Sequence, residues 1–195
     1  MTHHLVAVSA LSIVAGLLSQ ESKAQDNYGE VALSDDSIQL RYAVPSSASA
    51  VGSEPSELGF GLFLNENRDI VANADYYVEA RRLRFNRLTF KAGPVAYAAM
   101  LNTENTDVFG IAVGAEVRFE FLRRQGLDVV GKVAYAPDIL TFGAADKVWD
   151  VIGRVELPLA ENMVGFAGYR LFEIDLLEGT QEIEESLHLG LRYLF

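Results

Sequence analysis

Hydrophobic and polar residues alternate one by one over much of the chain after residue 25. The clearest segment is 109–121, FGIAVGAEVRFEF, in which odd positions carry Phe, Ile, Val or Ala and even positions carry Gly, Ala, Glu or Arg. Successive side chains of a β-strand point to opposite faces, whereas helical spacing would scatter both classes around the axis. The segment therefore predicts a strand with one apolar face and one polar face.

The same alternation recurs along the chain and predicts an all-β fold. Including 109–121, eight strands are predicted, at about 57–65, 73–82, 87–100, 109–121, 127–135, 149–157, 162–173 and 187–195. Residues 31–44 (VALSDDSIQLRYAV) add either a hairpin or one irregular strand, and the Ser-Asp-Asp-Ser run in their middle favours the hairpin. Ten strands are thus the first choice, and eight strands with an N-terminal flap are the alternative.

The polar faces distinguish a membrane barrel from a soluble one. In an outer-membrane barrel the apolar face meets lipid and the polar face lines the lumen, whereas in a soluble barrel the apolar face is inside. Here the polar faces combine glycines with charges of both signs, which suits a narrow lumen filled by ion pairs. Aromatic residues also gather at strand ends, as interfacial girdles do. We predict a small antiparallel transmembrane β-barrel, with a soluble lipocalin-like barrel as the competing interpretation. The predicted lumen-facing charges are Glu116, Arg118, Glu120, Lys132, Arg154 and Arg192.

The first 24 residues are typical of a secretory signal peptide. Residues 5–18 form an apolar run that is too short to cross a bilayer, and Ser22-Lys23-Ala24 offers a small-x-small cleavage site. A buried N-terminal helix explains the cleavage-like ending less well. We expect residues 1–24 to be removed and residues 25–195 to form the barrel domain.

Composition narrows the chemistry of the 195-residue chain. It has no cysteine, which excludes disulfide scaffolds, thiolate metal sites and thiol nucleophiles. Its net charge of −11 argues against a nucleic-acid partner, because phosphate binding requires clustered Lys and Arg. No metal triad or phosphate-binding loop is present in the sequence, so we expect no cofactor and no metal.

The spacing of the strands predicts the connections between them. With the C-terminus in the periplasm, segments 65–72, 136–147 and 173–185 become long outer loops, and the remaining turns are shorter, which is the order seen in bacterial barrels. Segment 173–185 is strongly acidic and could bind divalent cations that bridge lipopolysaccharide phosphates. A solvated loop is the simpler interpretation, because the spacing of a calcium-binding loop is absent.

The C-terminus resembles the closing strand of outer-membrane barrels, which the barrel-assembly machinery recognises. The pattern consists of His188, Gly190, Tyr193 and Phe195. Further short motifs resemble the YfaZ family of predicted outer-membrane proteins: Leu33–Ser37, Tyr135–Asp138, Gly168–Arg170 and Gly190–Arg192. The resemblance implies a small integral outer-membrane barrel and supplies no activity.

One arrangement of residues could support catalysis. His188 is the single histidine after residue 25, and Ser186 and Glu184 precede it on the same strand face. A Ser–His–acid set needs the base within hydrogen-bond reach of the hydroxyl, and residues two apart on a strand are not brought into contact by spacing alone. Because His188 also fills the polar position of the assembly motif, we expect no enzyme and assign no catalytic residue.

Three functions follow from these observations. The first is a structural or interaction barrel with a filled lumen, monomeric in the outer membrane of a Gram-negative bacterium and surrounded by outer-membrane lipid and lipopolysaccharide. The second is a narrow channel lined by the lumen charges. The third is a lipid-modifying enzyme that uses Ser186 and His188.

Overall fold

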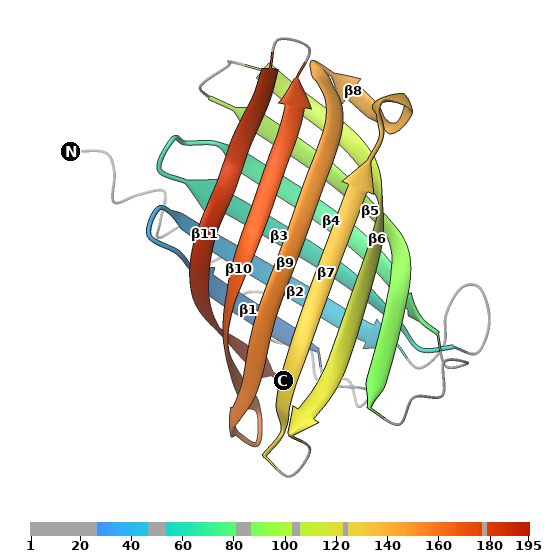
Figure 1. Cartoon of the computed structure of the whole chain (residues 1–195), viewed down its shortest axis with the longest axis vertical. Helices are drawn as coiled ribbons and strands as arrows, with labels where there is room; N and C mark the ends of the chain where they lie inside the picture. Colours follow the sequence, from blue (N-terminus) through green and yellow to red (C-terminus); the bar gives the residue numbers. More distant parts are fainter. Residues whose placement is uncertain (1–26, 47–53, 81–86, 103–105, 123–124, 177–178) are drawn as a thin grey trace.

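The fold is built from antiparallel strands that wind into a barrel (Figure 1). The computed structural model describes residues 27–46, 54–80, 87–102, 106–122, 125–176 and 179–195, so the expected signal peptide lies outside the described residues. The strands are β1 (Tyr28–Leu33), β2 (Ser37–Ser46), β3 (Ser56–Asn65), β4 (Ile70–Glu79), β5 (Leu88–Leu101), β6 (Thr106–Leu122), β7 (Leu127–Ala136), β8 (Thr141–Gly143), β9 (Ala145–Ala160), β10 (Met163–Leu176) and β11 (Gly179–Leu194). In the described ranges the single helical element is the 3₁₀ turn Asp138–Leu140, and no helix there is long and apolar enough to cross a membrane.

The sheet closes on itself. Each long strand pairs with its neighbours in sequence, β5 pairs with β6, and β1 pairs with β11, so that Tyr28 lies opposite Leu194. The result is a closed antiparallel barrel of ten strands, with the short strand β8 added beside β6. The ten-strand prediction is therefore confirmed. Segment 31–44 is the predicted hairpin, β1 and β2, and its turn is held by the hydroxyl of Ser34, which donates to Asp36.

The apolar faces of the strands point outward. On β6, Val113 is 68% exposed and Phe109 is 56% exposed, whereas Glu116 on the opposite face is 3% exposed. The same order holds on β11, where Leu187 and Leu189 are exposed and His188 between them is buried. A soluble protein would bury the leucines and expose the polar positions. A lipid bilayer stabilises this inverted arrangement, because the outward apolar side chains contact the lipid chains instead of water.

Aromatic side chains border this apolar band. Tyr135 and Trp149 pack against each other near the end that lies away from the C-terminus, with ring centroids 4.5 Å apart. Tyr193 and Phe195 lie at the opposite end, with centroids 5.3 Å apart. With a rise of about 3.4 Å per residue and a strand tilt of about 40°, the stretch of β9 from Trp149 to Leu159 crosses about 25 Å, the height of the lipid-facing band of such barrels.

Above Trp149 the polarity of the two faces reverses. Along β10, Leu171 faces outward and Arg170 inward, but two residues further on the outward position is Glu173 and the inward position is Phe172. Segment 173–185 is thus not a long loop, as the sequence predicted, but the end of β10 and the start of β11. Outside the lipid the strand pair follows the rule of a soluble protein, with charges facing water and apolar side chains inside.

The connections differ from the prediction for the same reason. At the end away from the C-terminus the intervals between strands are short, at 34–36, 66–69, 102–105 and 177–178, apart from 137–144, which holds the 3₁₀ turn and β8. The longer intervals at 47–55 and 80–87 separate β2 from β3 and β4 from β5. The expected long outer loops at 65–72 and 173–185 are therefore wrong, because residues expected in these loops extend the strands beyond the apolar band, whereas the interval expected at 136–147 remains long.

Candidate functional site in the barrel lumen

The inward faces of the strands form a charged lumen. Glu116, Arg154 and Arg192 are at most 9% exposed, and the side chains of Arg118 and Lys132 are 23% and 14% exposed. All five make ion pairs inside the barrel. Glu120 is partly buried near the end of β6, opposite Asp128 of β7. Strand alternation and closure of the barrel together place side chains from distant parts of the chain in one space.

The first set of ion pairs joins the two ends of the chain, and we call it the seam network. Arg154 of β9 binds Glu30 of β1 through both terminal nitrogens, each 3.1 Å from a carboxylate oxygen. Arg192 of β11 also binds Glu30, and its two terminal nitrogens lie 2.9 and 3.0 Å from Glu156. Arg118 of β6 reaches Glu156 at 2.7 Å. The network therefore ties β1, β6, β9 and β11 together across the strand pair that closes the barrel.

The second set lies on the opposite wall, and we call it the wall network. The guanidinium of Arg41 binds Asp75 through two nitrogens and Glu57 at 3.0 Å. Lys91 then joins Glu57, at 2.8 Å, to Glu116, at 3.6 Å. Glu116 also forms an ion pair with Lys132, whose Nζ lies 2.9 Å from a carboxylate oxygen of Glu116. The members of this network are Arg41, Glu57, Asp75, Lys91, Glu116 and Lys132.

A third set, the boundary cluster, lies where the lumen changes from charged to apolar. Arg170 forms two hydrogen bonds of 2.9 Å with Asp150 and one of 3.3 Å with Glu184. Its guanidinium also lies 5.1 Å from the ring centre of Phe63 and 4.8 Å from that of Phe172. Arg170 thus joins the ion pairs to an aromatic layer, and buried charges of this kind are tolerated only when each one is paired.

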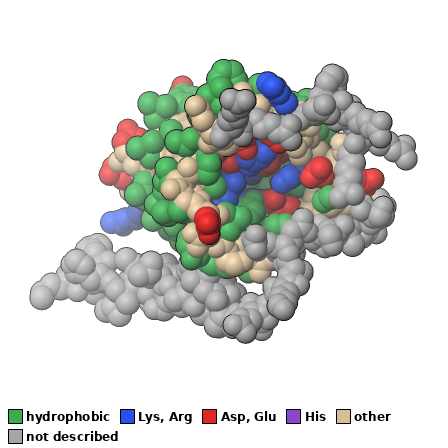
Figure 2. Space-filling view, turned by 90° about the horizontal axis from the view of Figure 1, so that it is seen from below, with side chains coloured by type: hydrophobic (Ala, Val, Ile, Leu, Met, Phe, Trp, Pro, Cys, Tyr) green, Lys and Arg blue, Asp and Glu red, His purple; other side chains and the backbone are tan. Residues whose placement is uncertain are grey.

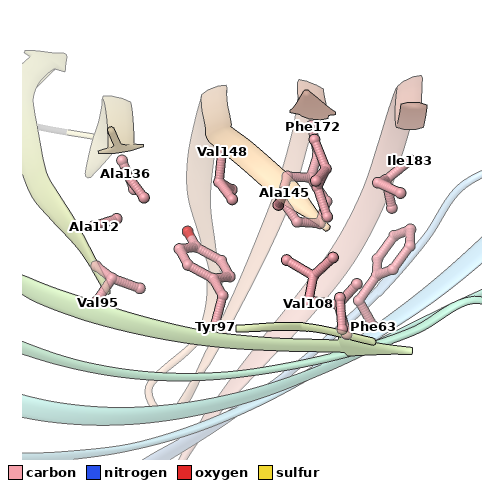
Figure 3. Close-up of a cluster of buried hydrophobic side chains, with 14 of the residues drawn as sticks. Phe63, Val95, Tyr97, Val108, Ala112, Ala136, Ala145, Val148, Phe172 and Ile183 are labelled. Atoms are coloured by element: carbon pink, nitrogen blue, oxygen red, sulfur yellow. The ribbon is translucent and has the colours of Figure 1, made fainter. Parts of the chain in front are cut away.

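Apolar side chains close the lumen at the end away from the C-terminus. Figure 3 shows side chains from opposite walls meeting in this layer, which we call the apolar plug. Phe172 and Val108 are completely buried, and Phe63, Ile174 and Leu101 are at most 2% exposed. The rings of Phe63 and Phe172 meet edge to face, with centroids 6.3 Å apart.

Asp69, which is itself fully buried, holds the turns above the plug. Its carboxylate accepts the backbone N–H of Asn102 at 2.8 Å and the side-chain amide of Asn65 at 3.0 Å. Asn65 in turn reaches the carbonyl of Ile183 at 3.3 Å. One carboxylate thus links the β3–β4 turn, the residue after β5, and β11 at the closed end.

The space that remains in the lumen is small. A cavity of about 50 Å³, which we call the central cavity, lies among residues of the seam network, the wall network and the boundary cluster. A larger hollow of about 290 Å³, the vestibule, lies at the end that holds the C-terminus and is lined by Glu57, Lys91 and Arg118 among others. Viewed from that end, Lys, Arg, Asp and Glu side chains gather inside a wall whose outer side is largely hydrophobic (Figure 2). Among the described residues, the lumen is therefore hollowed at one end and closed at the other.

Inward glycines allow long side chains to lie flat against the wall. A Cβ atom on Gly59 would lie 2.4 Å from the guanidinium of Arg41, and one on Gly114 would lie 2.3 Å from the hydroxyl of Tyr77. A Cβ atom on Gly190 would lie 2.2 Å from the ring of Phe166. A larger side chain at any of these glycines would displace a neighbour in the packed lumen, whereas the sequence alone indicates only small residues on a polar face.

The possible catalytic set is not assembled. Ser186 and His188 both face the lumen and are buried, as expected from their spacing. The hydroxyl of Ser186, however, donates to Glu184 at 2.9 Å, and Glu184 is also bound by Ser37 and Arg170. Nδ1 of His188 has no hydrogen-bond partner among the described residues, so the imidazole contacts neither the hydroxyl nor the acid through that atom. Glu184 acts as an ion-pair partner of Arg170.

Each residue of the C-terminal motif has a place in the closed barrel. His188 faces the lumen, and Gly190 accommodates the ring of Phe166. Tyr193 and Phe195 face outward, and Phe195 also approaches Tyr42, with ring centroids 6.4 Å apart. The backbone N–H of Phe195 donates to the carbonyl of Asn27 at 2.9 Å, which extends the closing strand pair.

The fold and the lumen define the class of this protein as a small, closed antiparallel β-barrel of the outer-membrane type. Among solved structures, it is similar to one described as a bacterial polysaccharide outer membrane secretin, with a TM-score of 0.51 and 10% identity over 82% of this chain and 56% of the other. It also matches the outer membrane channel DcaP of Acinetobacter baumannii (TM-score 0.44, 10% identity, 85% of this chain and 54% of that one). A third match is a KdgM porin in complex with disordered oligogalacturonate (TM-score 0.44, 10% identity, 88% and 99%).

At this identity the likeness to the secretin concerns the fold alone. The chain spans about half the length of the first two structures, at 56% and 54%. No family model matches the chain, and no curated protein matches it. The resemblance to the YfaZ family stays a prediction.

Proposed function

We propose that this protein is an integral outer-membrane barrel with a closed lumen, which serves a structural or interaction role rather than conducting solutes. The observation that carries the proposal is the filling of the lumen. Ion pairs occupy its charged part, and the apolar plug, with Phe63, Phe172 and Val108 at most 2% exposed, closes one end. The spaces of about 50 and 290 Å³ both lie on the charged side of the plug.

Physical chemistry explains why such a lumen resists ion flow. An ion that crosses the plug would leave water for a layer of aromatic and aliphatic side chains, which costs several kcal/mol or more without compensating partners. The charges below the plug bind one another, so little of their attraction is left for a passing ion. A barrel of about this size can be filled completely by its own side chains.

Several observations support the remaining parts of the proposal. The outward apolar band of about 25 Å and its aromatic borders suit residence in a bilayer surrounded by lipid and lipopolysaccharide. The arrangement of His188, Gly190, Tyr193 and Phe195 along the closing strand is consistent with handling by the barrel-assembly machinery. Each of the ten long strands that the structure describes pairs with a neighbour on both sides, and β8 pairs with β6 alone, which favours a monomer.

Conductance in planar bilayers tests the closed lumen. We expect the purified, refolded barrel to give no single-channel steps at any applied voltage. The double variant Phe63→Ala/Phe172→Ala, which removes two rings from the plug, should give small but measurable steps. Leu189→Ala on the lipid-facing side is the matched control and should stay closed. Regular steps from the wild-type protein would overturn the proposal.

A narrow channel is the second candidate, and the vestibule favours it. This hollow lies beside Lys91, Glu116 and Arg118, at the end of the barrel that holds the C-terminus. Conduction then requires only that the plug moves aside. Wild-type steps whose ion selectivity changes in Arg118→Gln would establish this second function. No enzymatic role is proposed, because Ser186 donates its hydrogen bond to Glu184.

A further inference from the structure

The central cavity has a lining rich in hydrogen-bond donors. Three buried side-chain nitrogens of the described residues have no hydrogen-bond partner, namely Arg41 Nε, Arg154 Nε and His188 Nδ1. All three belong to residues that line this one cavity. Buried polar atoms in native proteins are nearly always satisfied by protein, water or an ion, so their concentration at one cavity points to a bound species.

The carboxylates of the lining are already occupied. Glu30 accepts three hydrogen bonds from Arg154 and Arg192. The carboxylate of Asp150 accepts two from Arg170 and one, at 2.9 Å, from Tyr97. The charged groups still able to bind a guest are therefore donors, and these include the N–H groups of two arginines, while the amides of Gln39 and Asn73 can donate as well as accept. A guest that accepts hydrogen bonds fits this lining.

The charged groups around the cavity bind one another. The lining includes four cationic side chains, Arg41, Lys132, Arg154 and Arg170, and three carboxylates, Glu30, Asp75 and Asp150. Each of these cations also pairs with a carboxylate outside the lining, so the guest is selected by hydrogen-bond donors rather than by an excess charge. The volume of about 50 Å³ is enough for roughly three to five water-sized spheres, so a monatomic or similarly small anion fits together with water.

We propose that the central cavity binds one small monovalent anion of the halide type. The anion accepts hydrogen bonds from the two arginine Nε–H groups and from the ammonium of Lys132. It links the seam network to the wall network. This site is independent of conductance, since a barrel that never conducts can hold such an anion.

Two lysines provide a matched pair of variants for the test. Both pair with Glu116, at 2.9 Å for Lys132 and 3.6 Å for Lys91. Only Lys132 lines the central cavity, whereas Lys91 lines the vestibule. Lys132→Met should therefore remove the anion site, and Lys91→Met should leave it intact while weakening the same carboxylate's ion pairs.

The measurement is the thermal unfolding midpoint of the full barrel in zwitterionic detergent, at constant ionic strength, with sodium chloride replaced stepwise by sodium gluconate. A bound anion raises the midpoint with increasing chloride until the site saturates. We expect this saturable rise in the wild type and in Lys91→Met, and its loss in Lys132→Met. Equal midpoints in both salts, a rise retained in Lys132→Met, or a rise lost in Lys91→Met would each overturn the proposal.

A second measurement does not depend on the folding of a variant. Crystals of the wild-type barrel grown or soaked in sodium bromide should show an anomalous difference peak in the central cavity, within hydrogen-bond distance of Arg41 Nε and Arg154 Nε. If no peak appears in the cavity, whether or not bromide is bound elsewhere in the crystal, the proposed anion site is refuted and water is the occupant.

Discussion

Removal of Arg170 tests whether the buried charges stabilise the barrel only as complete sets. Arg170 is 3% exposed, binds Asp150 with two nitrogens and reaches Glu184 with a third. The variant Arg170→Met keeps much of the volume and the contact with Phe63 and Phe172, but it leaves two buried carboxylates without their cation. Breaking a buried ion pair in this way costs about 3–5 kcal/mol.

Because both carboxylates keep other hydrogen-bond partners in Arg170→Met, the lower end of this range of destabilisation applies. Glu184 keeps its bonds from Ser37 and Ser186, at 2.9 Å each, and Asp150 keeps the hydroxyl of Tyr97. We therefore expect a loss of about 3 kcal/mol in the free energy of unfolding. The triple variant Arg170→Met/Asp150→Asn/Glu184→Gln should recover most of this loss, because no uncompensated charge is left inside.

The assay is equilibrium unfolding by urea in lipid vesicles, followed by the fluorescence of the single tryptophan, Trp149, which faces outward at the edge of the apolar band. Lys147→Met, an exposed change on the same strand as Asp150, is the control and should stay within about 0.5 kcal/mol of the wild type. A loss below about 1 kcal/mol in Arg170→Met, or no recovery in the triple variant, would refute the reasoning.

Three further predictions concern the closed end, the inward glycines and the lipid-facing band. Asp69→Ala leaves the buried N–H of Asn102 without its acceptor, so stability should fall by about 1–3 kcal/mol and this amide should exchange faster in a hydrogen-exchange experiment. Gly114→Ala forces the phenol that lies over it to move and should cost about 1–3 kcal/mol in the urea assay, whereas Gly131→Ala, with nothing within 4 Å of the new Cβ, should be neutral or slightly stabilising. Val155→Arg, in the middle of the lipid-facing band, should cost about 2–4 kcal/mol in vesicle folding titrations, and an equal cost for Glu173→Arg above the band would contradict the position of the membrane boundary.

The positions of the strands could be predicted from the sequence because alternation is a local property. Residues 109–121 carry both faces of β6 in their order alone, and the Ser-Asp-Asp-Ser run marks the turn between β1 and β2. Glycines beside charges of both signs likewise indicate a filled lumen. The all-β barrel and its ten strands follow from such local signals together with the even strand number of bacterial barrels.

Two features depended on the tertiary structure. One is the position at which the apolar band ends. From residue 173 onward the strand still alternates, but its polar residues face outward and its apolar residues face inward. A single sequence cannot show where the surroundings change from lipid to water. Segment 173–185 was therefore interpreted as a loop although it continues β10 and β11.

The other feature is the choice of partners inside the lumen. The sequence predicted that Arg154 and Arg192 face inward, but not that both bind Glu30, which lies 124 and 162 residues away along the chain. Nor could it predict that the plug would form from Phe63 and Phe172, which belong to separate strands. Alternation determines the face on which a side chain lies, but its neighbours across the lumen are set by the order and register in which the strands close, and these long-range relations exist only in the folded barrel.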